Sequence, residues 1–165
     1  MAASDILMTL AEVSIALAGF GGIVAGLGYR SKGNWSSRDK FRLLVMVAAS
    51  IAVVFACFLP LTFQSLAFDD HWRVASGFLV LIPLANLIAQ YFWIREGIAQ
   101  ANIPAVLVIL LSNLIALWLA LSLLLNMHHP NLSAGLYLAA TVSTLATPAM
   151  LFIRLVITSF TQDND

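Results

Sequence analysis

The chain has 165 residues, of which 61% are hydrophobic and only 10% are charged, and its formal net charge is zero. Average soluble proteins carry about 25% charged residues, so the composition excludes an ordinary soluble domain, and the balanced charge argues against a nucleic-acid partner. Much of the apolar surface must therefore face lipid, and a helix needs about 20 apolar residues to cross the hydrocarbon core of a bilayer.

Five apolar runs of that length predict an all-α membrane protein, a bundle of five transmembrane helices in a single transmembrane domain over 1–165. The runs are continuous rather than alternating, which favours helices over barrel strands. The N-terminus lacks the basic region of a signal peptide, so we expect the first run to stay as a span. The expected spans are about 5–29, 37–68, 72–94, 103–125 and 133–160.

Basic residues predict the orientation of these spans. Five of the eight basic residues lie between the first two spans or in the first residues of the second: Arg30, Lys32, Arg38, Lys40 and Arg42. With five spans, Arg95 and Arg154 lie on that same side and Arg73 lies opposite. Because cytoplasmic loops carry the excess of Lys and Arg, we expect the N-terminus outside, the C-terminus in the cytoplasm and a multi-pass location in the plasma membrane.

The first span is unusually rich in glycine. Ser14, Ala18, Gly22 and Gly26 recur every four residues, and small residues at this spacing let two helices in a membrane approach closely. The pattern therefore predicts a helix-packing face. Its partner is either another helix of the same chain or a helix of a second protein.

A second row on this span has the composition of a pore lining. It runs in steps of four and three along one helix face: Glu12, Ala16, Gly19, Ile23, Gly26 and Arg30. Carboxylates within a span usually face a bundle interior or a watery cavity, and charged rings and apolar constrictions are parts of channels. Alternatively, Glu12 lies in interfacial water or pairs with Arg73 across the outer rim.

Two resemblances accompany these residues. The motif "GFGGIV", followed by "RDKFRLLVMVAAS" and "CFLP", resembles a group of small bacterial multi-span integral membrane proteins of unassigned function, over about the first sixty residues. This resemblance implies a bacterial inner membrane and carries no activity across. The order of acid, glycine, apolar residue and base is similar to the pore helix of Orai calcium channels, read in the opposite chain direction.

Two further polar groups stand out. Asp69, Asp70 and His71 are expected in one outer loop, and His128 and His129 in another. Carboxylates and imidazoles bind divalent transition metals, so these loops are a candidate metal site; the alternative is ordinary polar loops. Within the third and fourth spans lie Asn86, Gln90, Ser112 and Asn113, which either join helices by hydrogen bonds or line a polar pathway.

The sequence contains no nucleotide-binding loop, no HExxH and no CxxC, so we expect neither an enzyme nor a cofactor. The leading hypothesis is a homo-oligomeric, passive ion channel lined by the first helix. In it Glu12 selects ions, Ile23 gates and Arg30 bounds the inner mouth, with lipid and ions as partners. The alternative is a non-conducting membrane subunit or sensor that binds a partner helix through its small-residue face.

Overall fold

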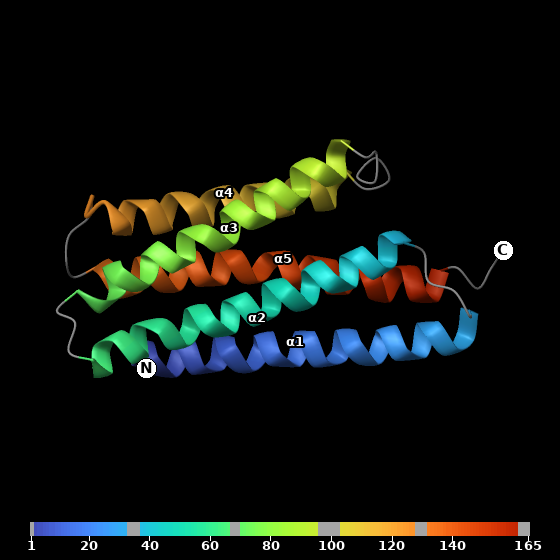
Figure 1. Cartoon of the computed structure of the whole chain (residues 1–165), viewed down its shortest axis with the longest axis horizontal. Helices are drawn as coiled ribbons and strands as arrows, with labels where there is room; N and C mark the ends of the chain where they lie inside the picture. Colours follow the sequence, from blue (N-terminus) through green and yellow to red (C-terminus); the bar gives the residue numbers. More distant parts are fainter. Residues whose placement is uncertain (1, 33–36, 67–69, 96–102, 128–131, 162–165) are drawn as a thin grey trace.

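The computed structural model describes residues 2–32, 37–66, 70–95, 103–127 and 132–161, and within them the side chains of 28–32, 37–39 and 158–161 are not described. These residues form five helices and no strand (Figure 1). The helices are α1 (Ala3–Lys32), α2 (Ser37–Ser65), α3 (His71–Arg95), α4 (Ile103–Leu124) and α5 (Ser133–Thr161).

The five predicted spans are confirmed as helices, each long and apolar enough to cross a membrane. Their ends differ from the prediction by at most three residues. Helix α1 begins at Ala3, and at this N-terminal end the Asp5 carboxylate accepts a hydrogen bond from the Ala2 backbone N–H at 3.0 Å. An acid in the first turn both satisfies a free donor and favours the positive end of the helix.

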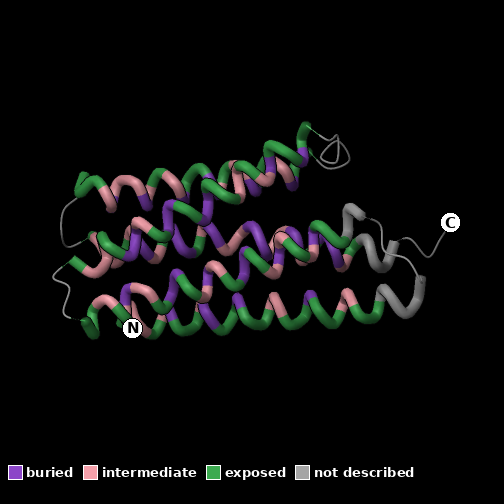
Figure 2. The backbone as a smooth tube through the Cα atoms, in the orientation of Figure 1, coloured by how far each residue is buried: buried purple, intermediate pink, exposed green. Residues whose placement is uncertain are grey.

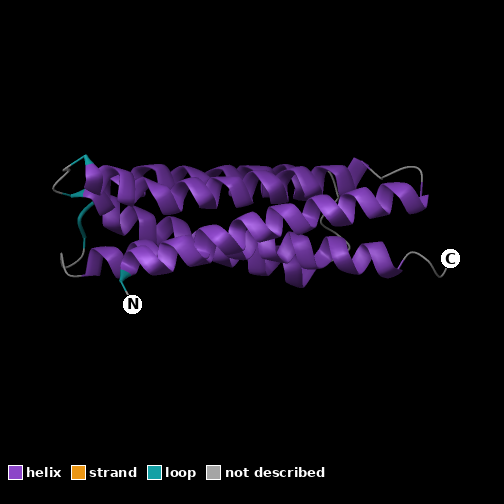
Figure 3. Cartoon of the chain, turned by 90° about the horizontal axis from the view of Figure 1, so that it is seen from below, coloured by secondary structure: helices purple, strands orange, loops and turns teal. Residues whose placement is uncertain are grey.

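The helices run along one common axis (Figures 1 and 3). Helix α5 is central and packs against the other four helices, whereas α1 packs against α2 and α5. Helices α1 and α4 lie at opposite edges of the bundle in Figure 1. Because the number of described helices is odd, α1 begins at one end of the bundle and α5 finishes at the other.

The core consists of two buried clusters. The larger one surrounds Tyr137, Leu79 and Val53, and the smaller one joins Met46, Trp93, Ile109 and Leu151. Large apolar side chains remain exposed on all five helices, which is the surface expected where lipid replaces water around a bundle.

The proline in α2 is compensated by a side chain of α5. Pro60 has no N–H, so the carbonyl of Ala56, four residues earlier, loses its helical partner. The hydroxyl of the fully buried Tyr137 donates to that carbonyl oxygen at 2.7 Å. This bond satisfies a backbone acceptor and ties α2 to α5.

Helix α4 ends in a left-handed cap. Asn126 has a φ of 55°, and the N–H of Met127 donates to the carbonyl of Ser122 at 2.9 Å. The guanidinium of Arg73 also donates to the carbonyl of Leu124 through Nε at 2.9 Å. A cation at a helix C-terminus is stabilising, so Arg73 anchors the start of α3 on the end of α4.

Candidate functional site

Helix α1 has one buried face and one open face. Its buried side chains are Leu7, Ala11 and Ser14, and Gly21 is buried farther along the same side. The opposite side of α1 is turned away from the bundle, and Figure 2 shows it exposed along most of the helix. The open face is therefore free to meet lipid or another protein.

The candidate pore-lining row lies on that open face. Glu12, Ala16, Gly19, Ile23 and Gly26 are all exposed, and Ile23 keeps 58% of its surface accessible. The side chain of Arg30 lies outside the described ones, although α1 continues through this residue as a helix. The structure thus places the described members of the row together on one unpartnered surface.

The candidate helix-packing row behaves differently along its length. Ser14 is fully buried and donates through Oγ to the carbonyl of Leu10 at 2.8 Å. Ala18 is half-buried, whereas Gly22 and Gly26 are exposed. Four residues turn a helix about 40° beyond one full turn, so the row drifts from the buried face to the open face.

The glycines of the open face have free space around them. A Cβ placed on Gly19, Gly22 or Gly26 would have no other atom within 4 Å. These glycines therefore serve no close contact inside the protomer. A smooth, thin helix face of this kind permits a second helix backbone to approach closely.

The glycine that does allow a close contact was not singled out from the sequence. A Cβ on Gly21 would collide with Cε of Met46, the buried methionine of α2. Gly21 therefore leaves room for the end of the Met46 side chain, which would have to move if residue 21 carried a Cβ. Gly21 and Gly22 are adjacent glycines, so residue type does not distinguish them. Only the helical position of Gly21, on the same side as Ser14, indicates that it faces the bundle.

Glu12 has no ion partner within the described part of the protomer. It lies nine residues after the first residue of α1, or about 14 Å along the helix at 1.5 Å per residue. The suggested pairing with Arg73 is not among the contacts of these two described residues, and Arg73 Nε donates instead to the carbonyl of Leu124. Exposed large apolar residues, Val13 and Ile15, lie beside Glu12. A carboxylate in such a setting is costly in lipid.

The candidate metal site falls largely outside the described residues, which exclude Asp69, His128 and His129. Of its remaining members, Asp70 is exposed and His71 is half-buried, with its ring 5.0 Å from the ring of Trp72. Within the described ranges no three His, Cys, Asp or Glu residues gather as metal ligands would.

A polar cluster joins α3, α4 and α5. Asn86 Nδ2 donates to Asn113 Oδ1 at 3.1 Å, and Asn113 Nδ2 donates to Thr147 Oγ1 at 2.9 Å. Gln90 Nε2 donates to the carbonyl of Val106 at 2.8 Å. Ser112, in contrast, donates to the carbonyl of Ile109 in its own helix. Three of the four polar residues noted in the sequence therefore link helices.

No family model, curated protein or solved structure matches this chain. The candidate sites therefore rest on the geometry of the protein itself.

Proposed function

We propose that the protein is a homo-oligomeric, passive ion channel of the plasma membrane, in which copies of α1 surround the pathway. The observation that supports it is the open face of α1, which consists of exposed residues only: Glu12, Ala16, Gly19, Gly22, Ile23 and Gly26. A single protomer leaves this face, with its carboxylate, turned towards lipid. Several copies meeting at a symmetry axis would place it around water.

Each part of the open face has a role in this proposal. Glu12 forms an acidic ring that selects among ions, and the exposed Ile23 forms an apolar constriction. Gly19, between Glu12 and Ile23, and Gly26, between Ile23 and Arg30, have no neighbouring atoms around their Cβ positions and leave room for water. Arg30, at the other end of the helix, bounds the inner mouth.

The proposed orientation follows from the basic residues. Arg30, Lys32 and Arg95 lie at the ends of α1 and α3 that share one end of the bundle. The excess of positive charge assigns this end to the cytoplasm, so the mouth that contains Glu12 opens outside the cell.

The direct test is electrical recording from purified full-length protein in planar bilayers. We expect discrete current steps, and Glu12→Gln should alter the ratio of cation to anion permeability. Asp70→Asn is the matched control, because Asp70 is an exposed acid beyond the open face of α1. The control should leave the permeability ratio unchanged.

The absence of current steps from a folded oligomer would contradict the channel proposal. Equal permeability ratios in Glu12→Gln and in the unmodified protein would also contradict it. Silence combined with association through the open face would instead favour the second hypothesis, a non-conducting subunit that binds a partner helix. The same small-residue surface supports that hypothesis, since close helix approach does not itself require a pore.

A further inference from the structure

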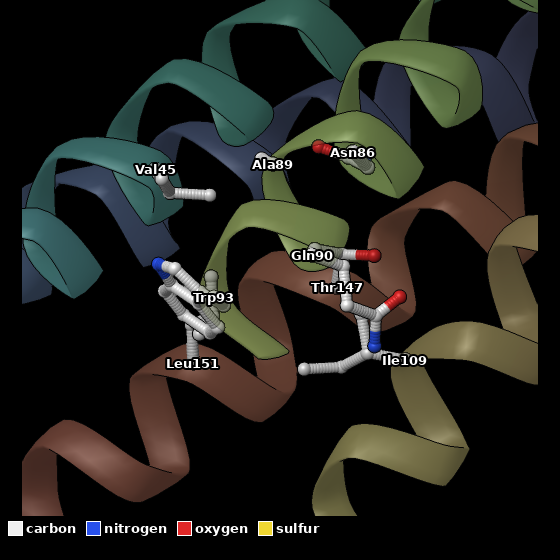
Figure 4. Close-up of a pocket in the computed structure, with 8 residues that line it drawn as sticks. All are labelled: Val45, Asn86, Ala89, Gln90, Trp93, Ile109, Thr147 and Leu151. Carbon is white, nitrogen blue, oxygen red and sulfur yellow. The ribbon is translucent and has the colours of Figure 1, made fainter. Parts of the chain in front are cut away.

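A small cavity lies among four helices of the bundle, away from the open face of α1. It has a volume of about 20 Å³, which is room for one water-sized group. Helices α2, α3, α4 and α5 all contribute to its wall (Figure 4). The lining residues are Val45, Asn86, Ala89, Gln90, Trp93, Ile109, Thr147 and Leu151.

Two residues that line the cavity each have a buried polar side-chain atom without a hydrogen-bond partner, namely Gln90 Oε1 and Trp93 Nε1. Gln90 is 5% exposed and Trp93 is 7% exposed. The amide of Gln90 is held by its bond to the carbonyl of Val106, so Oε1 is a fixed acceptor. Leaving such atoms unpaired costs about 1–3 kcal/mol each, and buried polar groups are normally satisfied.

An apolar groove between α2 and α3 adjoins this cavity. The groove has a volume of about 370 Å³, within the range of small-molecule sites. It shares Val45, Asn86 and Ala89 with the cavity. Five alanines shape it, two of them exposed to the surroundings of the bundle: Ala48, Ala49, Ala52, Ala85 and Ala89. The groove is therefore open sideways, where lipid surrounds the bundle.

The lining defines the chemistry of an occupant. No Asp, Glu, Lys, Arg or His is among the described residues of the cavity or groove, so a charged headgroup finds no partner there. The alanines fit an apolar chain. The polar end must supply a donor for Gln90 Oε1 or an acceptor for Trp93 Nε1–H, and Figure 4 shows these two side chains on different sides of the cavity. A hydroxyl group offers both functions.

We propose that this cavity and groove form a binding site for a neutral, single-chain lipid that carries a hydroxyl group, such as a long-chain alcohol. The lipid enters sideways from the membrane between α2 and α3. Its chain occupies the alanine groove, and its hydroxyl group donates to Gln90 Oε1. The site is independent of the proposed channel, because neither Glu12 nor the open face of α1 contributes to it.

Photolabelling tests this proposal on the full-length protein in lipid nanodiscs. The probe is decanol with a diazirine on its chain, and labelled peptides are identified by mass spectrometry with and without excess unlabelled decanol. We expect competed adducts on the groove segments of α2 and α3. A diazirine decane without the hydroxyl should label this groove about tenfold less, the effect of one lost hydrogen bond of about 1.4 kcal/mol.

Two variants separate specific binding from solubility in the bilayer. Gln90→Leu removes the acceptor, and Ala85→Phe fills the groove from an exposed position, so both should lower the competed adducts about tenfold. Ala139→Phe, an exposed alanine of α5, is the matched control and should not change them.

Three results would overturn the proposal: adducts spread evenly over the lipid-facing helices, equal labelling by the hydroxyl-free probe, or full labelling of folded Ala85→Phe. Evenly spread adducts would leave the cavity as a water site only.

Discussion

Replacing Tyr137 with phenylalanine tests how the bundle accommodates the proline in α2. The change removes only the hydroxyl group that donates to the Ala56 carbonyl at 2.7 Å. Pro60 prevents the helix from supplying another donor, and Tyr137 is fully buried, so the carbonyl stays unpaired. We expect the free energy of unfolding to fall by about 1–3 kcal/mol, the cost of an unsatisfied buried acceptor.

A second substitution distinguishes this cause from a general packing defect. Pro60→Ala restores a backbone N–H that can donate to the Ala56 carbonyl. In a Pro60→Ala background, Tyr137→Phe should therefore cost less than half as much as it does in the unmodified protein. Pro148→Ala is the matched control, because Pro148 lies in α5 and frees a different carbonyl. In that background the full cost should remain.

The assay is reversible unfolding in mixed micelles of increasing denaturing-detergent content, followed by circular dichroism. Equal costs of Tyr137→Phe in the Pro60→Ala and Pro148→Ala backgrounds would refute the reasoning. So would a cost near zero in the unmodified protein, since the carbonyl would then have found another partner.

Three further predictions concern other contacts of the bundle. In a double-mutant cycle on the same unfolding assay, Asn86→Leu and Asn113→Leu should couple by about 0.6 kcal/mol, the average worth of a hydrogen bond between membrane helices, and strictly additive costs would contradict their bond. Gly21→Leu should destabilise the protomer by about 1–3 kcal/mol through overpacking, whereas Gly22→Leu should leave unfolding unchanged and reduce the assembly size measured by light scattering; the reverse order would contradict the assignment of the two faces. The thiol of Cys57, which is buried, should react with N-ethylmaleimide only after unfolding, and rapid labelling of the folded protein would show that this region is open.

The five helices could be predicted from the sequence because the bilayer imposes a strict length and polarity on every span. The predicted ends of the helices were less accurate, because helix ends depend on local hydrogen bonds such as the one between the Asp5 carboxylate and the Ala2 N–H. The sequence also indicated that Asn86, Gln90 and Asn113 are either helix links or a polar lining. Their hydrogen bonds across helices show a linking role, which hydropathy cannot reveal.

The open face of α1 could be predicted only in part. Periodicity placed Glu12, Ile23 and Gly26 on one face of the helix, but which face the bundle would cover depends on how α2 and α5 pack. Gly21 and Gly22 illustrate this limit, because adjacent residues on a helix point about 100° apart, one against Met46 and the other into open space.

The cavity among α2, α3, α4 and α5 was not predicted at all. Trp93 lies near the end of α3, and its indole is buried in a cluster with Met46, Ile109 and Leu151. Four helices converge on the cavity, and convergence of this kind is a property of tertiary packing that no single segment encodes.

The central claim is that copies of α1 gather around a shared axis with Glu12 facing it. The most direct measurement is a single-particle structure of the purified assembly in lipid nanodiscs. Our account predicts a symmetric oligomer in which Glu12 and Ile23 of every copy point towards the symmetry axis. A folded monomer, or an oligomer whose axis is lined by α3 or α4 while the Glu12 face of α1 meets lipid, would contradict it.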